Sequence, residues 1–141
     1  MIEERGCIWK KHEKGYFIAV TTNGVVKADG TCVMGKGIAL QAAQKFPTLP
    51  EKLGYKLRRS GNHVYAFLEI RILSFPTKHD WRDPSSLSLI KQSCEELVAI
   101  LHEYNIDRLY MTRPGCGNGR LDWNDVKPIL EGTLDDRFII V

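Results

Sequence analysis

Residues 112–123 read TRPGCGNGRLDW and connect an expected strand, DRLYMT, to an expected helix, DWNDVKPILEGTL. Three glycines, Gly115, Gly117 and Gly119, stand within five positions of this stretch. Glycine lets backbone amides approach a ligand closely, and the positive end of a helix dipole attracts anions. Glycine is also the ordinary marker of a turn. The stretch therefore predicts either a structural turn or an anion-binding loop.

The same order of strand, glycine-rich loop and helix occurs earlier in the chain. VVKADGTCVMGKG, residues 25–37, follows the strand-like YFIAVTT and precedes the helix-forming GIALQAAQKF. Neither glycine loop fits the pattern GxxxxGK[ST], and neither reads GxGxxG in the dinucleotide-binding context. Two such loops in one small domain nevertheless favour an anion over two plain turns.

The remaining expected elements fix the fold class. Further strands are expected at GCIWKK, VYAFLE, RILSF and RFIIV, and further helices at KLGYKLRRSGN and SSLSLIKQSCEELVAILHEYN. Ser85 or Ser86 can cap the last of these helices, and Asp122 or Asn124 can cap the helix that follows the opening stretch. This alternation predicts one α/β domain over residues 1–141, with three α/β/α layers around a central mixed or largely parallel sheet. Ligands of such sheets bind where the carboxyl ends of strands lead into helices.

Composition sets the broad class. The chain is 43% hydrophobic and 26% charged, with a net charge of +3 and a pI of about 8.7. Such a balance fits a soluble globular protein, and it permits an anionic ligand without demanding a nucleic-acid surface. The spacing of the four cysteines matches neither a zinc pattern nor a short disulfide framework. We expect reduced thiols in a cytoplasmic protein, with no metal, no cofactor and no membrane partner.

A third polar loop, PTKHDWRDP, follows the expected strand RILSF and carries reactive candidates. Lys78 is either a surface charge or, if its pKa is lowered, a nucleophile or electrostatic catalyst. Trp81 is either a core anchor or a platform for an aromatic ring or a sugar. Asn23 is either the first residue of an Asn-Gly turn or an amide directed at a sugar hydroxyl. Cys116 has no histidine in its loop, so we interpret it as a small packing residue.

Four motifs together resemble the macrodomain, the ADP-ribose-binding fold. They are VTTNG, VMGKGIALQAAQKFP, SFPTKHDWR and RPGCGNGRLDW, which occur in family order between about residues 19 and 130. The branch that they are similar to contains the terminal ADP-ribose glycohydrolase and the antitoxin macrodomains that remove ADP-ribose from DNA. No single motif is specific, but the set is.

The resemblance implies a three-layer fold that binds ADP-ribose between two loops. It makes Lys78 and Asn23 catalytic, because the distal ribose lies near them and the family's lysine attacks or polarises the anomeric carbon. A ring-opened ribose offers an aldehyde-like carbon to such an amine. The ligand-binding residues that the resemblance implies are Met34, Gly35, Lys36, Gly37, Ile38, Trp81, Arg113, Pro114, Gly115, Cys116, Gly117, Asn118, Gly119 and Arg120.

The sequence departs from the family pattern in three places. Gly119 stands where the terminal glycohydrolase has an assisting aspartate, which weakens deribosylation of protein and leaves a DNA-directed activity standing. The usual Gly-Asp pair, whose aspartate contacts adenine, has no clear counterpart near WKKHEKG. The loop NGVVKADGTC is longer than in the antitoxins.

Three functions remain open on the sequence. The first is an ADP-ribosyl hydrolase acting on a modified nucleic acid, a modified protein or a small conjugate such as ADP-ribose 1″-phosphate. The second is a module that binds ADP-ribose without turnover, for which Asn23 and the glycine loops suffice. The third is a nucleic-acid reader that uses Arg58, Arg59, Lys36, Lys78 and Trp81. The expected partners are ADP-ribose or an ADP-ribosylated substrate, including ADP-ribosylated nucleic acid.

Overall fold

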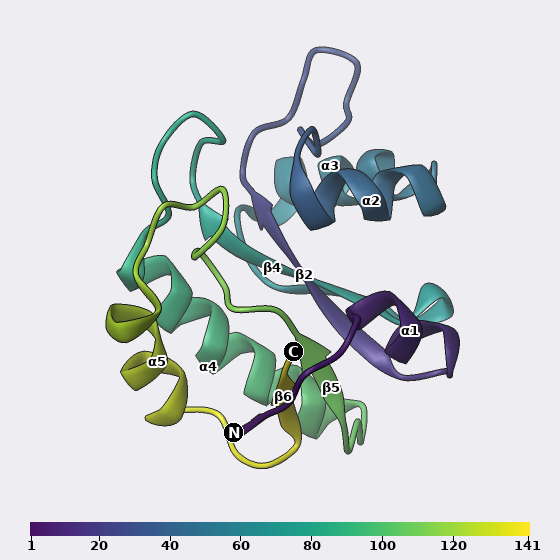
Figure 1. Cartoon of the computed structure of the whole chain (residues 1–141). Helices are drawn as coiled ribbons and strands as arrows, with labels where there is room; N and C mark the ends of the chain where they lie inside the picture. Colours follow the sequence, from purple (N-terminus) through teal and green to yellow (C-terminus); the bar gives the residue numbers. More distant parts are fainter.

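A mixed six-stranded sheet runs through the middle of the computed structural model, which describes residues 1–141 (Figure 1). The strand order is β1-β6-β5-β2-β4-β3. The strands are β1 (Ile2–Glu3), β2 (Phe17–Asn23), β3 (Tyr65–Phe67), β4 (Ile72–Lys78), β5 (Leu109–Met111) and β6 (Phe138–Ile140). Every pair is parallel except β3 with β4. The expected central mixed sheet is thus confirmed.

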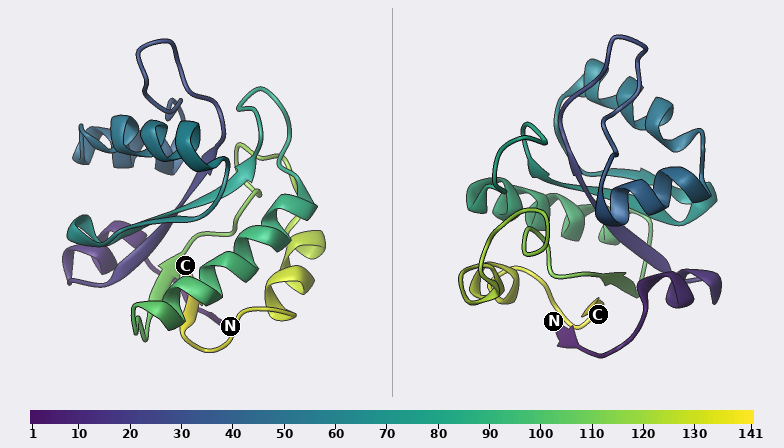
Figure 2. Two further views of the ribbon diagram at one scale, coloured as in Figure 1. Left: turned by 180° about the vertical axis from the view of Figure 1, so that it is seen from behind. Right: turned by 45° about the horizontal axis from the view of Figure 1, so that its top comes forward.

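Helices cover both faces of the sheet and complete the expected three layers (Figures 1 and 2). On one face lie α1 (Ile8–Glu13), α2 (Gly37–Lys45) and α3 (Leu49–Ser60), and on the other α4 (Leu87–Glu103) and α5 (Trp123–Glu131). Side chains of successive strand residues point to opposite faces, so β2 serves both cores. Ile18 and Val20 pack in the core of α1–α3, whereas Ala19 packs in the core of α4 and α5.

Local signals in the sequence set both helices of the second face. Ser86 caps α4, because its hydroxyl accepts a hydrogen bond from the backbone N–H of Leu89 at 3.2 Å. Asp122 caps α5 in the same way, accepting from the N–H of Asn124 at 2.9 Å. Both capping predictions are confirmed.

No helix of the structure combines the length and the apolar composition that crossing a bilayer requires.

The strand expected at GCIWKK is wrong, because α1 occupies residues 8–13. Ile8, Trp9 and His12 are its buried residues, a spacing that fits one side of a helix rather than alternate strand positions. His12 fixes the helix through a 2.7 Å hydrogen bond between its Nε2 and the carbonyl of Ile70. Six residues show too little of either period to distinguish the two structures.

Three smaller differences concern strand limits. β1 was not expected, because two residues carry no periodic signal. The strand expected at VYAFLE ends at Phe67 and turns into a short 3₁₀ helix, η1 (Leu68–Ile70). β4 continues past Phe75 to Lys78, so the first part of PTKHDWRDP is strand rather than loop.

The loop between β2 and α2, residues 24–36, is fastened to α3. The backbone N–H of Cys32 donates to the carbonyl of Pro50 at 2.9 Å, and the Arg58 guanidinium donates to the carbonyl of Lys27 at 3.1 Å. A Cβ on Gly54 would overlap the Gly30 carbonyl oxygen. The loop backbone therefore lies directly on the helix at Gly54.

We expect Gly54→Ala to lower the free energy of unfolding by about 1–3 kcal/mol, the usual cost of overpacking a filled site. Alanine inside a helix normally stabilises it by about 1 kcal/mol relative to glycine, so the sign of the change is diagnostic. Urea denaturation measures it. Gly6→Ala, whose Cβ would meet only the flexible Lys11 side chain, at 3.7 Å, is the control. A more stable Gly54→Ala variant would show that the loop does not rest on α3.

Candidate functional site

Three loops meet at one end of the sheet. They connect β2 to α2 (residues 24–36), β4 to α4 (residues 79–86) and β5 to α5 (residues 112–122), and Figure 1 shows them on the same side of the strands. They meet because β2 lies between β4 and β5 and runs parallel to both. A cavity of about 830 Å³ lies among them. The candidate site is therefore at the carboxyl ends of the central strands, as expected.

Most residues expected at the site line this cavity. They are Asn23, Gly35, Lys36, Gly37, Ile38, Lys78, Trp81, Arg113, Gly115, Cys116, Gly117, Asn118 and Gly119. Three others do not line it. Met34 packs in the core of α1–α3, Pro114 is buried, and Arg120 lines a smaller neighbouring cavity.

Eight further residues line the cavity, and none of them was expected to bind a ligand. They are Thr21, Thr22, Val33, Ala39, Thr77, Ser85, Thr112 and Val141. The four threonines stand within the last three positions of β2 and β4 or directly after β5. Strand ends alone were a sufficient signal for these four, because side chains there face the ligand edge of a parallel sheet.

Asn23 uses its side chain to shape the loop that follows it. Its Nδ2 donates to the carbonyl of Val33 at 2.8 Å, and its Oδ1 accepts from the backbone N–H of Val25 at 2.9 Å. The residue is only 8% exposed. An amide has two N–H groups and two acceptor positions, so one of each is left for a ligand. The turn and the sugar-contact interpretations of Asn23 are therefore compatible.

Lys78 lies beside Asn23 and reaches across to the β5–α5 loop. The two residues are partners in the β2–β4 register, after an irregularity at Thr22 and Asn23. Lys78 Nζ donates to the carbonyl of Asn118 at 3.1 Å and to that of Trp81 at 3.4 Å. Partial burial lowers its pKa from the ordinary 10.5, and the nearby charges of Arg120 and Lys36 lower it further. The amine therefore loses its proton more easily than a surface lysine.

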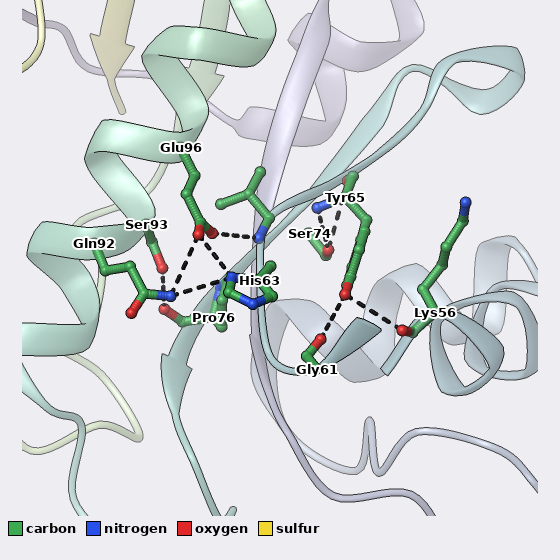
Figure 3. Close-up of polar contacts among 10 residues, drawn as sticks. Lys56, Gly61, His63, Tyr65, Ser74, Pro76, Gln92, Ser93 and Glu96 are labelled. Atoms are coloured by element: carbon green, nitrogen blue, oxygen red, sulfur yellow. Dashed lines mark hydrogen bonds and ion pairs between the residues drawn. The ribbon is translucent and has the colours of Figure 1, made fainter. Parts of the chain in front are cut away.

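The strand that carries Lys78, β4, forms hydrogen bonds with helix α4 and with the turn before β3. Ser93 of α4 donates to the carbonyl of Pro76 at 2.7 Å, as Figure 3 shows. Glu96, also on α4, accepts from the backbone N–H of Val64 at 2.9 Å and contacts His63 Nδ1 at 2.7 Å. Asn62, at the start of the same turn, donates to the carbonyl of Lys78 itself at 3.0 Å. These bonds fix the position of the Lys78 backbone relative to α4.

The β5–α5 loop needs glycine at two positions for different reasons. Gly115 has a φ of +78°, which side chains disfavour. A Cβ on Gly119 would overlap both the Ser85 hydroxyl and the Gly115 carbonyl oxygen. By contrast, a Cβ on Gly117 would meet no atom within 4 Å. The loop folds tightly over Ser85, whose backbone N–H donates to the Gly119 carbonyl at 2.9 Å.

The thiol of Cys116 is poorly suited to act as a nucleophile. Partial burial raises its pKa, so the thiolate is disfavoured. The residue packs against the core of α4 and α5. Its placement agrees with the packing role expected from the sequence.

The cavity lining is positively charged. Lys36, Lys78 and Arg113 line it, and no aspartate or glutamate does. The Arg113 guanidinium lies over the Trp123 ring, 4.9 Å from its centre. The structure contains no group of three His, Cys, Asp or Glu side chains that could hold a metal ion. Cations and glycine loops together suit a ligand with a diphosphate.

Comparison with known proteins points to one group. No family model matches the chain. A DNA ADP-ribosyl glycohydrolase of Mycobacterium tuberculosis is 34% identical over 104 residues, 67% of this chain but 30% of that protein. The ADP-ribose glycohydrolase OARD1 of Bos taurus is 31% identical over 113 residues, 74% of this chain and 68% of that protein. The structure resembles the macrodomain of Thermus aquaticus DarG with a TM-score of 0.80 and 26% identity, covering 99% and 95% of the two chains.

The tight fold of the β5–α5 loop can be tested with two matched glycine substitutions. We expect Gly119→Ala to lower the free energy of unfolding by about 1–3 kcal/mol, because the new methyl group enters occupied space. Gly117→Ala should change it by no more than about 0.5 kcal/mol, as for an open surface position. Thermal and urea denaturation report both values. Equal effects of the two substitutions would contradict the close approach of Gly119 to Ser85.

Proposed function

The chain belongs to the macrodomain family, and on this premise we propose that it binds ADP-ribose and hydrolyses the bond that joins ADP-ribose to a modified macromolecule. One observation carries the proposal. Lys78, with its lowered pKa, lies next to Asn23 at the edge of a cavity lined by two glycine loops. The cavity supplies a diphosphate site and the lysine supplies a reactive amine.

In the proposed complex the diphosphate lies between the residues around the start of α2 and the β5–α5 loop. Backbone amides at Gly35 and Gly37 and the N-terminus of α2 contribute one side, and the amides of residues 115–119 contribute the other. Lys36 and Arg113 balance the two negative charges. The distal ribose then lies at Asn23 and Lys78, where the free N–H of the amide can donate to a ribose hydroxyl.

The proposed reaction passes through the lysine. The lone pair of the neutral Lys78 amine attacks the anomeric carbon, the bond to the leaving group breaks, and the leaving group takes up a proton. The remaining amine proton passes to the ring oxygen as the ribose ring opens, and this step gives a Schiff base. Water then adds to the same carbon, the carbon–nitrogen bond breaks, and ADP-ribose and free lysine are released.

We propose a DNA-linked substrate rather than a protein-linked one. The support comes from relatives whose name includes DNA ADP-ribosyl glycohydrolase and from Gly119 in place of an assisting aspartate. The chain spans 30% of the length of that M. tuberculosis relative, so its substrate is transferred only as a proposal. A second candidate is an ADP-ribose-binding module without turnover, because no carboxylate lines the cavity to assist proton transfer.

Domain organisation and compartment belong to the same proposal. We propose that residues 1–141 form one macrodomain, since all six strands join a single sheet. We also propose a cytoplasmic location. All four cysteines are free thiols, as in a reducing compartment.

Replacement of the lysine separates binding from chemistry. We expect Lys78→Ala to lower kcat for release of ADP-ribose from thymidine-linked ADP-ribose about 100-fold or more, because the reacting group is lost. Wild type should bind ADP-ribose with a micromolar Kd, about −8 kcal/mol, and the variant should lie within about tenfold of it. Chromatography of released ADP-ribose and calorimetry measure the two quantities. Wild-type turnover by the variant would rule out the lysine mechanism, and binding without turnover by wild type would favour the binding module.

The pH dependence tests the protonation state of Lys78. Only the neutral amine attacks, so kcat should rise with pH as Lys78 loses its proton, at a pH below the ordinary 10.5. Asp83 raises the pKa of Lys78 through its negative charge. Asp83→Asn removes that charge, so the rise in kcat should move to lower pH. A pH–rate profile of both proteins checks the direction, and a shift to higher pH would contradict the proposed role of the neutral amine.

A further inference from the structure

A second cavity of about 470 Å³ opens directly beside the proposed ADP-ribose site. It shares Lys36, Lys78, Trp81, Gly117 and Asn118 with the larger cavity. Two further residues, Arg82 and Arg120, complete its lining. Lys78 thus stands between the two cavities. The position proposed above for the anomeric carbon, next to Lys78, therefore borders the second cavity as well as the main one.

Four of the seven residues that line the second cavity are cationic, and three of these have no acidic partner. Arg82 is paired with Asp80 at 2.6 Å, a contact that lowers the pKa of that carboxyl group to about 2. Lys36, Lys78 and Arg120 form no ion pair. Since unpaired cations repel one another in a confined space, such a cluster is best compensated by an anionic ligand.

The backbone at Arg120 also points to a ligand role. Arg120 has a φ of +63°, a left-handed conformation that costs a residue with a side chain about 1 kcal/mol or more. The Arg120 guanidinium reaches the β4–α4 loop, where its Nη2 donates to the carbonyl of Arg82 at 3.1 Å. Only one of its five N–H donors is used in this bond, so the others are free to bind an oxyanion.

Trp81 supplies a flat surface at the same place. Its side chain is 45% exposed and lines both cavities. The Arg82 guanidinium lies 5.7 Å from the ring centre and partly covers it. Every nucleobase has a flat face that can stack on such a ring. Unpaired cations next to an exposed indole match the repeating phosphate and base of a single strand.

We propose that the second cavity is a leaving-group site that binds a phosphate of the nucleic-acid strand to which ADP-ribose is attached. Arg120 binds the phosphate, and Trp81 stacks on a neighbouring base. The proposal rests on the hydrolase function proposed above. Arg58 and Arg59 take no part, because they lie on α3 and donate to the carbonyl of Lys27 and the hydroxyl of Tyr55, respectively.

The test compares two substrates that differ only in phosphates. One is ADP-ribosylated thymidine, and the other is the same unit within a short single-stranded oligonucleotide. Wild type should use the oligonucleotide with a kcat/KM about tenfold higher, in line with a charge-assisted hydrogen bond. Arg120→Gln should remove this preference while acting on the nucleoside and oligonucleotide alike. The ratio of the two values excludes any general effect of Arg120 on the pKa of Lys78.

Two further variants separate ligand binding from folding. Arg120→Gly relieves the left-handed backbone, so it should be at least as stable as wild type and still lose the preference for the oligonucleotide. Arg59→Gln, a surface arginine outside both cavities, should keep the preference. The proposal would be overturned if wild type used the two substrates with equal kcat/KM. It would also be overturned if Arg59→Gln lost the preference for the oligonucleotide as fully as Arg120→Gln.

Binding of an unmodified fluorescent thymidine oligonucleotide makes the cavity testable apart from catalysis. Fluorescence anisotropy should show that Arg120→Gln weakens binding of the oligonucleotide. The slope of log K against log salt should become less negative by about 0.7, the value for one phosphate contact. Arg59→Gln should leave the slope unchanged. If wild type releases no ADP-ribose from either substrate, the hydrolase proposal fails, and this slope still decides the phosphate site. An unchanged slope in Arg120→Gln would refute it.

Discussion

Parallel pairing of β2 with both β4 and β5 is the constraint on which the rest of the structure depends. It places the carboxyl ends of three strands at one edge, so three loops from distant parts of the chain converge there. The register then sets Asn23 beside Lys78. Burial of Ile18 and Val20 on one face and Ala19 on the other keeps β2 central. A slip of one residue in that register would reverse every side chain of the strand and separate the two polar residues.

The sequence was sufficient for the layers, the mixed sheet, the macrodomain family and most of the cavity lining, since these depend on motif order and on strand–helix alternation. It was insufficient for short elements. Trp9 and His12 can be assigned to one side of a helix only from their contacts in the fold. Trp9 packs in the same core as β2, and His12 forms a hydrogen bond with the carbonyl of Ile70, and both partners lie elsewhere in the sequence. The four threonines near the strand ends could have been predicted as lining residues, because strand ends face the ligand edge of the sheet. Arg82 was out of reach, because its part in the second cavity depends on how the β4–α4 loop folds against Arg120.

The charges that line the cavity affect the protonation of Lys78. The lining of the main cavity has three cations and no carboxylate, and Arg120 adds a fourth charge next to Lys78. Partial burial lowers the pKa of the Lys78 amine, and repulsion by Arg120 and Lys36 lowers it further. The cations of this lining therefore also make the Lys78 amine easier to deprotonate. Lys36, Arg113 and Arg120 come from the loops, whereas Lys78 itself is the last residue of β4.

The packing at Gly119 has an evolutionary consequence. An aspartate at this position requires the loop to shift, because the Gly115 carbonyl and the Ser85 hydroxyl already fill the space of a Cβ. Replacing Ser85 with a smaller residue would remove only one of the two obstacles, because the Gly115 carbonyl belongs to the main chain. The path between the two kinds of loop must pass through a change of backbone. As long as the loop keeps this backbone, a carboxylate beside Lys78 would have to come from a position other than residue 119.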